Sequence, residues 1–494
     1  MGELDVLVRK GIAEGQSKPE LKARLSAQGF MDVDIDVTIQ KHDQRPDVQQ
    51  KANVITTKEI IDRIGYGLTS PQLVNILFLF TGAGLFLIGL VNGLKAILTN
   101  IIGGLVQEYD KSKRITPTMI RSGGILFGFS FIFLSIGIIF KAPWFFTIAL
   151  LSGSIGIVTH GDTFQQFTHQ QLRKEKMPWF LAHISLAGLL FTAAGLLVSG
   201  YIMSSIPLQG IPLTLSLLGM QLSFRLYGFI ICFEVTAILF IISGYLLSRL
   251  KPEEVQEKNV FIFDAFLLKT QQNLKIWRKN SLAVLATAAT VLIIVSELVV
   301  NSYFGIFIYR QFSNVGLGGF MNVAVIFVIA LVAAVFGPLI TRSVNLKIGE
   351  GPMLVFGTLL VAILPLTIYA SPMLISVGTA TAISIIGAAL LGTAQGMFFR
   401  KILLKDELAG YFSSLALLSI IPIIILVPIF SWMAQSYGIG TVMLLLALLI
   451  SCVAAPLYFI IVWKTRKIVV TDFYVDTKGR LTLDLVQKQV IRAP

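Results

Sequence analysis

The sequence carries little charge for its length. Asp, Glu, Lys and Arg make up only 14% of its 494 residues, while 55% are hydrophobic and the mean hydropathy is +0.79. Soluble domains carry about 25% charged residues, so this chain has too few to keep a comparable surface in water. The composition excludes an ordinary soluble protein and predicts a chain embedded in the lipid bilayer.

Residues that would support metal, redox or nucleotide chemistry are also scarce. The two cysteines, Cys232 and Cys452, both lie within apolar runs, which argues against a disulfide framework. The four histidines show no metal-ligand spacing, and no G-x-x-x-x-G-K-[ST] loop for ATP is present. No cluster of acids, and no Ser/His set near one interface, suggests a membrane enzyme. We therefore expect no cofactor, no bound metal and no enzymatic activity.

The charge that is present marks topology. The net charge is +13, but the basic residues gather in short segments between apolar runs and form no basic groove. We therefore expect no nucleic-acid partner. Residues 1–50 are polar and contain no apolar segment of a cleavable signal.

Apolar runs dominate the chain between residues 73 and 463. A helix needs about 20 apolar residues to cross a bilayer. Eleven runs qualify: 73–107, 119–140, 143–161, 179–203, 225–248, 281–308, 317–341, 352–371, 373–397, 411–434 and 438–463. The first run, as one helix, would be about 52 Å long, far more than a hydrocarbon core of about 30 Å.

The distribution of Lys and Arg between the runs predicts the topology. The segments after residues 107, 161, 248, 341 and 397 are rich in bases, whereas the intervening loops hold only Lys141, Arg310 and the border residue Arg225. By the positive-inside rule, the first set is cytoplasmic. A cytoplasmic N-terminus then requires two crossings before Lys111, so we divide the first run near residue 82.

The division gives a helix at about 60–81 and a second at about 84–108, hence twelve membrane-spanning helices. We expect an all-α polytopic membrane protein of the plasma membrane with both termini cytoplasmic. Asp62 and Arg63 can then lie only at the cytoplasmic mouth of the first helix.

The chain divides into five segments. We expect a small helical module at 1–50, a first bundle at 51–250, an amphipathic linker at 251–280, a second bundle at 281–463 and a tail at 464–494. The module contains Ser17 and Glu20 in capping-box spacing and closes on Gly29. The tail alternates β-branched and polar residues around 477–479, which predicts a hairpin. Both ends could equally be solvated tails or docking modules.

Two halves of the chain repeat one pattern. "GGLVQEYDKSKR" at 103–114 and "GPLITRSVNLK" at 337–347 share G-x-L-[VI]-x-[ER], 234 positions apart. "LRKEKMPWF" at 172–180 matches "LKDELAGYF" at 404–412 at an offset of 232. The repeat predicts two six-helix halves, an organisation typical of secondary transporters with a site between the repeats.

The repeated motif is similar to that of the major facilitator superfamily, whose signature G-x-L-x-D-R-x-G-[RK]-[RK] lies between helices 2 and 3, with a weaker copy between helices 8 and 9. The resemblance covers roughly residues 57–463. The residues that fit the first copy are Gly103, Leu105, Tyr109, Lys111 and Lys113, and those that fit the second are Gly337, Leu339 and Arg342. The family's Asp and Arg positions are Gln107 and Glu108 here, and its second Gly is Asp110.

The motif also has a physical interpretation of its own. Gly103 and Gly337 would allow two helices to approach closely. The charges that follow could bridge helix ends when a cytoplasmic gate is shut, with Glu108 in place of the missing Asp and Lys111 and Arg342 as bases. The alternative is that these charges only mark the cytoplasmic side.

Ionisable residues within the membrane are costly and are candidates for function. Glu297 lies midway along "VLIIVSELVVNSYF", with Asn301 one turn further on the same face. The resemblance implies that helix 7, which contains both, lines a central cavity together with helices 1, 4 and 10. Burial without a partner would favour the protonated carboxyl, and a structural carboxyl bonded to a neighbouring helix is the alternative.

Lys95 is a second intramembrane charge. It follows Asn92 by three residues in "VNGLKAILTN", and an acid from the other half, such as Glu297, would be a partner. Alternatively, its long side chain extends to the interface.

The remaining candidates are His160 and Asp162 in helix 4, Glu234 in helix 6, His183 in helix 5 and Gln395 in helix 10. His160 and Asp162 are two residues apart and so point to different faces of a helix, which argues against a His–Asp relay made by that pair. Glu234, His183 and Gln395 fit packing roles at least as well.

The sequence thus predicts a secondary transporter that moves a small solute by alternating access, driven by a proton or cation gradient. A transporter-shaped membrane sensor or scaffold is the alternative. It would act through its cytoplasmic termini, and a cytoplasmic partner of residues 1–50 is one form of this.

Overall fold

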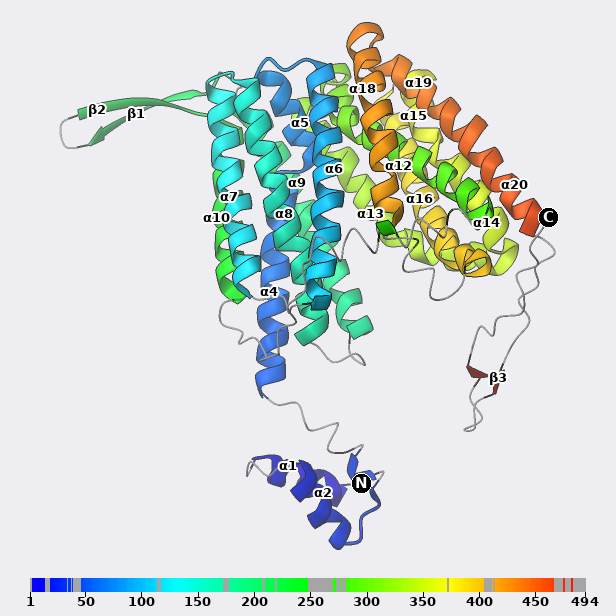
Figure 1. The fold of residues 1–494 in the computed structure, drawn as a ribbon. Coiled ribbons are helices and arrows are strands. Elements are labelled where there is room, and N and C mark those ends of the chain that lie inside the picture. The colour runs from blue at the N-terminus through cyan, green and yellow to red at the C-terminus, as the bar shows by residue number, and fades with distance from the viewer. Residues whose placement is uncertain are drawn as a thin grey trace.

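The computed structural model describes residues 2–13, 18–32, 34–36, 38, 46–112, 117–171, 177–206, 209–217, 220–247, 270–271, 277, 281–370, 373–403, 411, 414–465, 474–475 and 481–482. Nearly all the described residues are helical, and the helices stand side by side as two bundles (Figure 1). In lipid, a helix satisfies its own backbone hydrogen bonds, which explains why apolar runs adopt this form.

The first bundle follows the expected order of spans. Its helices are α4 (Pro46–Leu68), α5 (Pro71–Phe80), α6 (Leu85–Ser112), α7 (Pro117–Ile139), α8 (Pro143–Gln171), α9 (Met177–Ser205) and α10 (Gly228–Leu246). The second bundle contains α12 (Ser281–Gln311), α13 (Gly319–Ile348), α14 (Glu350–Val361), α15 (Ile363–Ala370), α16 (Leu374–Ile402), α18 (Ile420–Tyr437), α19 (Ile439–Leu449) and α20 (Ala455–Thr465).

Within the described residues, eleven segments are long and apolar enough to cross a membrane. The expected first span at 60–81 corresponds to the end of α4 together with α5, and these two helices are separated at Thr69 and Ser70 because Pro71 begins α5. The long apolar run is broken between Phe80 and Leu85, at the turn around residue 82 that the loop charges predicted. The prediction of an all-α polytopic membrane protein is confirmed.

Proline also interrupts the span of α14 and α15. Pro365 cannot donate a backbone hydrogen bond to Val361, four residues earlier. The hydroxyl of Ser384 in α16 donates to the Val361 carbonyl instead, at 3.2 Å. A neighbouring helix thus satisfies the freed backbone group, as a membrane interior requires.

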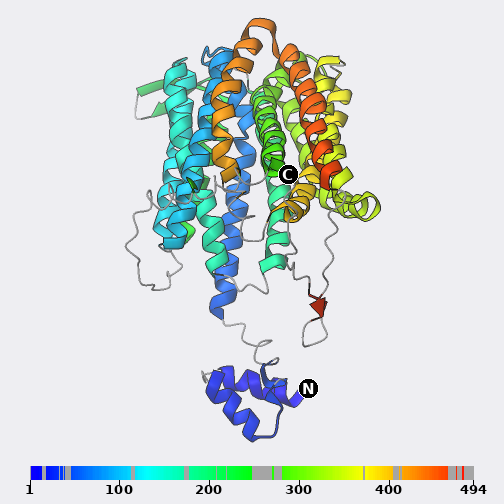
Figure 2. The ribbon, with the colours of Figure 1, turned by 45° about the vertical axis from the view of Figure 1, so that its right-hand side comes forward.

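We call the end where α4 begins and α6 finishes the inner end, and the end of the α5–α6 turn the outer end. The inner end is the one predicted to be cytoplasmic. The helices α1 (Gly2–Ala13) and α2 (Lys18–Ala27) lie beyond it (Figure 1, Figure 2). They pack around Leu4, Val8, Leu21, Leu25 and Ile35.

The C-cap signal expected in the N-terminal module is present. Gly29 follows α2 with φ of +90°, a left-handed conformation that glycine adopts readily. Ser17, the other end of the expected cap, lies outside the described residues, as do most of the linker 251–280 and most of the tail. In the tail, β3 (Tyr474–Val475) pairs antiparallel with β4 (Leu481–Thr482) around the predicted turn.

A second hairpin was not expected from the sequence. β1 (Ile211–Leu217) pairs antiparallel with β2 (Met220–Leu226) between α9 and α10. It projects sideways from the outer end of the first bundle (Figure 1).

Candidate functional site

The first bundle encloses a cluster of polar side chains in its interior, which we call the buried cluster. Its members are Lys58 and Asp62 of α4, His160 of α8 and Ser243 of α10. All four are almost fully buried, with exposed fractions of 0% for Lys58, His160 and Ser243 and 3% for Asp62. Charged groups are seldom buried in this way unless they are paired.

Every polar group of the cluster has partners. Lys58 and Asp62 are one helical turn apart and form an ion pair, and Asp62 also accepts a hydrogen bond from the Ser243 hydroxyl. The Lys58 ammonium lies 3.1 Å from His160 Nε2 and 3.6 Å from the centre of the Phe164 ring. The ammonium therefore has an acid, an imidazole and an aromatic face around it.

The contacts of His160 define its tautomer when it is neutral. Its Nδ1 lies 3.0 Å from the carbonyl oxygen of Ile120 in α7, and because a carbonyl only accepts, Nδ1 carries a proton. Its Nε2 lies 3.0 Å from Asp62 Oδ2 as well as close to Lys58. Nε2 can accept from Lys58 when it carries no proton and can donate to Asp62 when it does.

Glycine makes room for the imidazole. A Cβ at Gly124 of α7 would lie 2.9 Å from His160 Nδ1 and 2.9 Å from the Phe240 carbonyl of α10, closer than real side chains approach. The Phe240 ring meets the imidazole edge to face, with 5.7 Å between the ring centres. The helix crossing therefore holds His160 in one position.

The structure corrects one expectation about Asp62. It lies buried in the bundle interior, where Lys58, His160 and Ser243 supply the partners that water would otherwise provide. Its neighbour Arg63 is partly exposed and pairs with Glu59 at 2.7 Å. Sequence reasoning missed Lys58, Asp62 and Ser243 as site residues, although the i, i+4 spacing of Lys58 and Asp62 was a signal for a pair.

His160 and Asp162 point to different faces, as predicted. Asp162 is exposed, and its Oδ2 lies 3.2 Å from the position a Cβ would take at Gly103 of α6. At Gly337 of α13, a Cβ would lie only 2.7 Å from Ala389 Cβ of α16. Gly337 thus occupies a close helix contact, whereas among the described residues the only atom near Gly103 is the end of the Asp162 side chain.

For the other motif residues that it describes, the structure gives burial but no contact that would identify a gate. Leu105 is partly buried and Arg342 is exposed. The side chains of Glu108 and Lys111 lie outside the described part of the structure, so their bridging role stays a prediction.

The two bundles are joined mainly toward the outer end. Asn75 of α5 donates to the Ser302 carbonyl of α12 at 3.2 Å, and Asn92 of α6 donates to Asn75 Oδ1 at 3.1 Å. The Tyr303 hydroxyl donates to the Leu85 carbonyl at 3.1 Å. We call this set the outer junction.

Further bonds between the bundles link other helices. The Met321 amide of α13 donates to Ser204 Oγ of α9 at 3.1 Å. Deeper along α6, Asn100 donates to the Ala416 carbonyl at 3.1 Å.

Lys95 and Glu297 lie just inward of the outer junction. Lys95 follows the bonded Asn92 by three residues, and Glu297 precedes Ser302 by five. Both side chains are partly buried. Among the described residues, neither forms a hydrogen bond or an ion pair, and the two do not pair with each other.

The other predicted candidates have different surroundings. Asn301 is exposed on α12, and Asn92 is bonded within the outer junction. Gln395 of α16 donates to the Tyr458 hydroxyl of α20 at 2.7 Å, and that hydroxyl lies 2.7 Å from Thr290 Oγ1 of α12. Gln395 thus ties three helices of the second bundle together, which favours the packing role. The side chain of His183 is not among those described.

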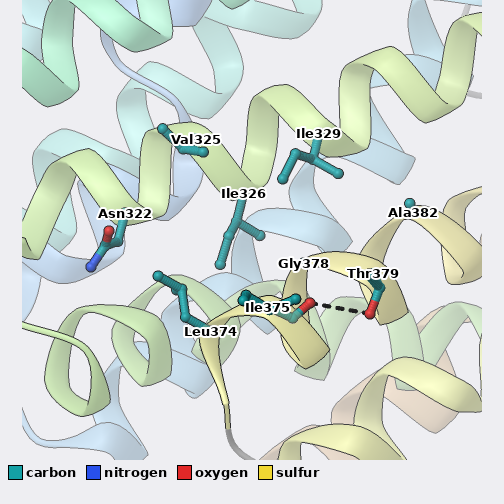
Figure 3. A pocket seen from close by; sticks show the side chains of 9 residues that line it. All are labelled: Asn322, Val325, Ile326, Ile329, Leu374, Ile375, Gly378, Thr379 and Ala382. Carbon is teal, nitrogen blue, oxygen red and sulfur yellow. Dashed lines mark hydrogen bonds between the residues drawn. The ribbon is translucent and has the colours of Figure 1, made fainter. Parts of the chain in front are cut away.

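A cavity of about 360 Å³ lies between α13 and α16 (Figure 3). Its lining is almost entirely apolar, with Ile326, Ile329, Leu374 and Ile375 prominent. The amide of Asn322 at its edge is already bonded to the carbonyls of Phe312 and Val315. The cavity contains none of the candidate charges. Among the described residues, no cluster of ligands that could hold a metal ion is present.

Comparisons with solved structures identify the fold. The nucleoside transporter NupG matches with a TM-score of 0.62 at 11% identity, covering 83% of this chain and 98% of NupG. A bacterial homolog of the human lysosomal transporter Spinster gives 0.61 at 13% identity, covering 86% and 98%. A bacterial homologue of the human drug peptide transporters PepT1 and PepT2 gives 0.62 at 11%, covering 85% and 100%.

These matches confirm the fold of the major facilitator superfamily, the resemblance suggested by the repeated motif. At such low identity they establish the fold alone. No protein-family model matches the sequence, and no curated protein matches it.

Proposed function

We propose that this chain is a secondary active transporter that moves a small solute by alternating access and is driven by a proton or cation gradient. The observation that supports this most is the pair of uncompensated charges, Lys95 and Glu297, just inward of the outer junction. They belong to different bundles, so a solute that contacts both would connect the two moving parts.

Glu297 is the proposed coupling residue. An ionised carboxylate that is removed from water without a partner is strongly unfavourable, and such a group becomes neutral by binding a proton. Because no described residue compensates Glu297, a proton or a cation from one side of the membrane would be its partner. Exchange of that partner as the bundles rock would link the gradient to transport.

Lys95 is the proposed anchor for the solute. A Lys ammonium offers three donors and no acceptor, so its natural ligand is an anionic or carbonyl oxygen. In this conformation it forms no described ion pair, and a carboxylate or phosphate of a solute would supply one. We therefore expect an anionic or zwitterionic solute, which would compete with Glu297 for Lys95 when the bundles move.

The known transporters of this fold are consistent with such a role. The matched structures include a nucleoside transporter and proton dependent oligopeptide transporters. They show that the fold accommodates small polar solutes.

Purified protein in liposomes tests the proposal. A panel of labelled anionic, zwitterionic and neutral solutes is offered with an imposed proton gradient, and separately with a sodium gradient. We expect one anionic or zwitterionic class to accumulate, and an uncoupler to reduce that accumulation to equilibration. Lys95→Met should abolish uptake of the same class.

The alternative, a sensor or scaffold, predicts a different result. No solute would accumulate under either gradient, and the purified protein would instead bind a cytoplasmic protein through residues 1–50. The separate apolar core of α1 and α2 is the observation that keeps this role open.

A further inference from the structure

The hairpin of β1 and β2 places its apolar and polar residues in alternate pairs, with Pro212 as the exception. In an antiparallel pair, residues opposite each other lie on the same face of the ribbon, and the faces alternate along each strand. The register brings together Ile211 with Leu226, Leu213 with Phe224, Leu215 with Leu222 and Leu217 with Met220. The alternate pairs are Pro212 with Arg225, Thr214 with Ser223 and Ser216 with Gln221.

By the register, one face of the ribbon is assigned eight apolar residues and the other is assigned Pro212 and five polar residues. Seven residues per strand extend over about 24 Å. A two-stranded hairpin is marginally stable in water, and it needs a cover for its apolar face.

The root of the hairpin is fixed at the outer end of the first bundle. Gly210 begins it with φ of +75°, and Gly228 at its other end packs so closely on α9 that a Cβ would lie 2.8 Å from the Ile202 carbonyl. The Arg225 side chain is exposed and donates to the Gln209 carbonyl at 3.3 Å. The strands then run sideways from α9 and α10, across the direction of the helices (Figure 1, Figure 2).

Exposed aromatic residues mark the membrane boundary at the same end. Trp144 near the start of α8, Tyr201 near the end of α9 and Tyr437 at the end of α18 are 70%, 66% and 62% exposed. Exposed Trp and Tyr of membrane proteins gather at the level of the lipid headgroups. Tyr201 precedes β1 by ten residues, so the hairpin leaves the bundle close to this level.

We propose that the hairpin lies flat on the outer surface of the bilayer, with its apolar face in the lipid and its polar face in water. The hairpin runs across the helix direction, begins near the expected headgroup level and has a two-faced register. These are properties of an interfacial element, which lies at the boundary between headgroups and acyl chains. On the polar face, Arg225 at the root is placed to meet lipid phosphate groups. The hairpin extends the membrane contact of the first bundle beyond its helices.

Spin labels at neighbouring positions test this in the full-length protein. Thr214 and Leu215 are adjacent but lie on opposite faces, so Thr214→Cys is the matched control for Leu215→Cys. Both are made with Cys232 and Cys452 replaced by Ser, labelled with a nitroxide and placed in lipid nanodiscs that hold one protein each. Accessibility of each label to oxygen, which concentrates in lipid, is compared with accessibility to a water-soluble nickel chelate.

We expect the label at 215 to be accessible to oxygen and protected from nickel, and the label at 214 to show the reverse. Ser223→Cys and Leu222→Cys should repeat this alternation on β2. Equal access of nickel to 214 and 215 would place the hairpin in water and overturn the proposal. Protection of 215 from both reagents would mean that the hairpin packs on protein. Protection of 215 that requires several copies in one vesicle would identify a second copy of the chain as the cover, which also contradicts the proposal.

Discussion

The buried cluster and the region just inward of the outer junction each contain a lysine and an acid, but in opposite surroundings. In the cluster, Lys58 and Asp62 are paired with each other and bonded to His160 and Ser243. Lys95 and Glu297, inward of the junction, are partly buried and have no such partners among the described residues. Charges with complete partners contribute to the folded state, and removing one of them leaves another uncompensated. Charges without partners do not stabilise the folded state in this way, and we propose that they are available to bind a proton or a solute.

The largest effect should follow from breaking the cluster at its acid. Asp62→Leu leaves the Lys58 ammonium buried without its counter-charge, which costs about 3–5 kcal/mol for a buried ion pair. Thermal unfolding of the purified protein in detergent should show a large fall in Tm. The double variant Lys58→Met/Asp62→Leu removes both charges and should recover most of the loss. An unchanged Tm for Asp62→Leu would show that water reaches the cluster.

Ser243 should have a smaller effect of the same kind. Ser243→Ala removes one hydrogen bond to the Asp62 carboxylate, and bonds to charged groups contribute about 1.5–3 kcal/mol. Thr236, on the same helix, is buried with no hydrogen-bond partner for its hydroxyl among the described residues, so Thr236→Val is the matched control and should not lower Tm. Equal losses in the two variants would attribute the effect to packing.

Glu297 should behave differently from Asp62 in the same assay. Glu297→Gln removes a carboxyl that no described residue compensates, so Tm should stay the same or rise slightly. A fall comparable to that of Asp62→Leu would show that Glu297 is a structural carboxyl held by a neighbouring helix, the alternative considered from the sequence.

The smallest effect should come from a Lys–Asp pair in water. Lys22 and Asp36 of the N-terminal module are 2.5 Å apart, with side chains 36% and 59% exposed, and the hydrogen bond to Asp36 raises the pKa of Lys22. Exposed ion pairs contribute little to stability. Asp36→Asn should therefore leave the unfolding of the module, followed by circular dichroism, unchanged. A clear loss would mean that pairing matters irrespective of burial.

Much of the fold could be predicted from local patterns. Hydropathy located eleven spans, and the excess of Lys and Arg on one side required the break that the structure shows between Phe80 and Leu85. One motif glycine, Gly337, lies at a close helix contact. These features depend on residues near one another in the sequence, or on the cost of charge in lipid.

The buried cluster could not be predicted in the same way. From the sequence, Asp62 could be placed only at the cytoplasmic mouth of the first helix, because its partners His160 and Ser243 are about 100 and 180 residues away. The pairing depends on how α4, α8 and α10 cross. The β1–β2 hairpin was different: its alternation of apolar and polar residues is visible at 211–226 and was a signal available from the sequence alone.

The most direct test of the difference between paired and unpaired charges is transport by Glu297→Gln in liposomes. The glutamine imitates the protonated carboxyl and cannot release a proton. Using a solute that the wild-type protein accumulates, we expect the variant to lose accumulation against a gradient while it still exchanges labelled for unlabelled solute across the membrane. Accumulation at the wild-type level would contradict the account, because the coupling proton would then bind elsewhere and Glu297 would be a structural residue.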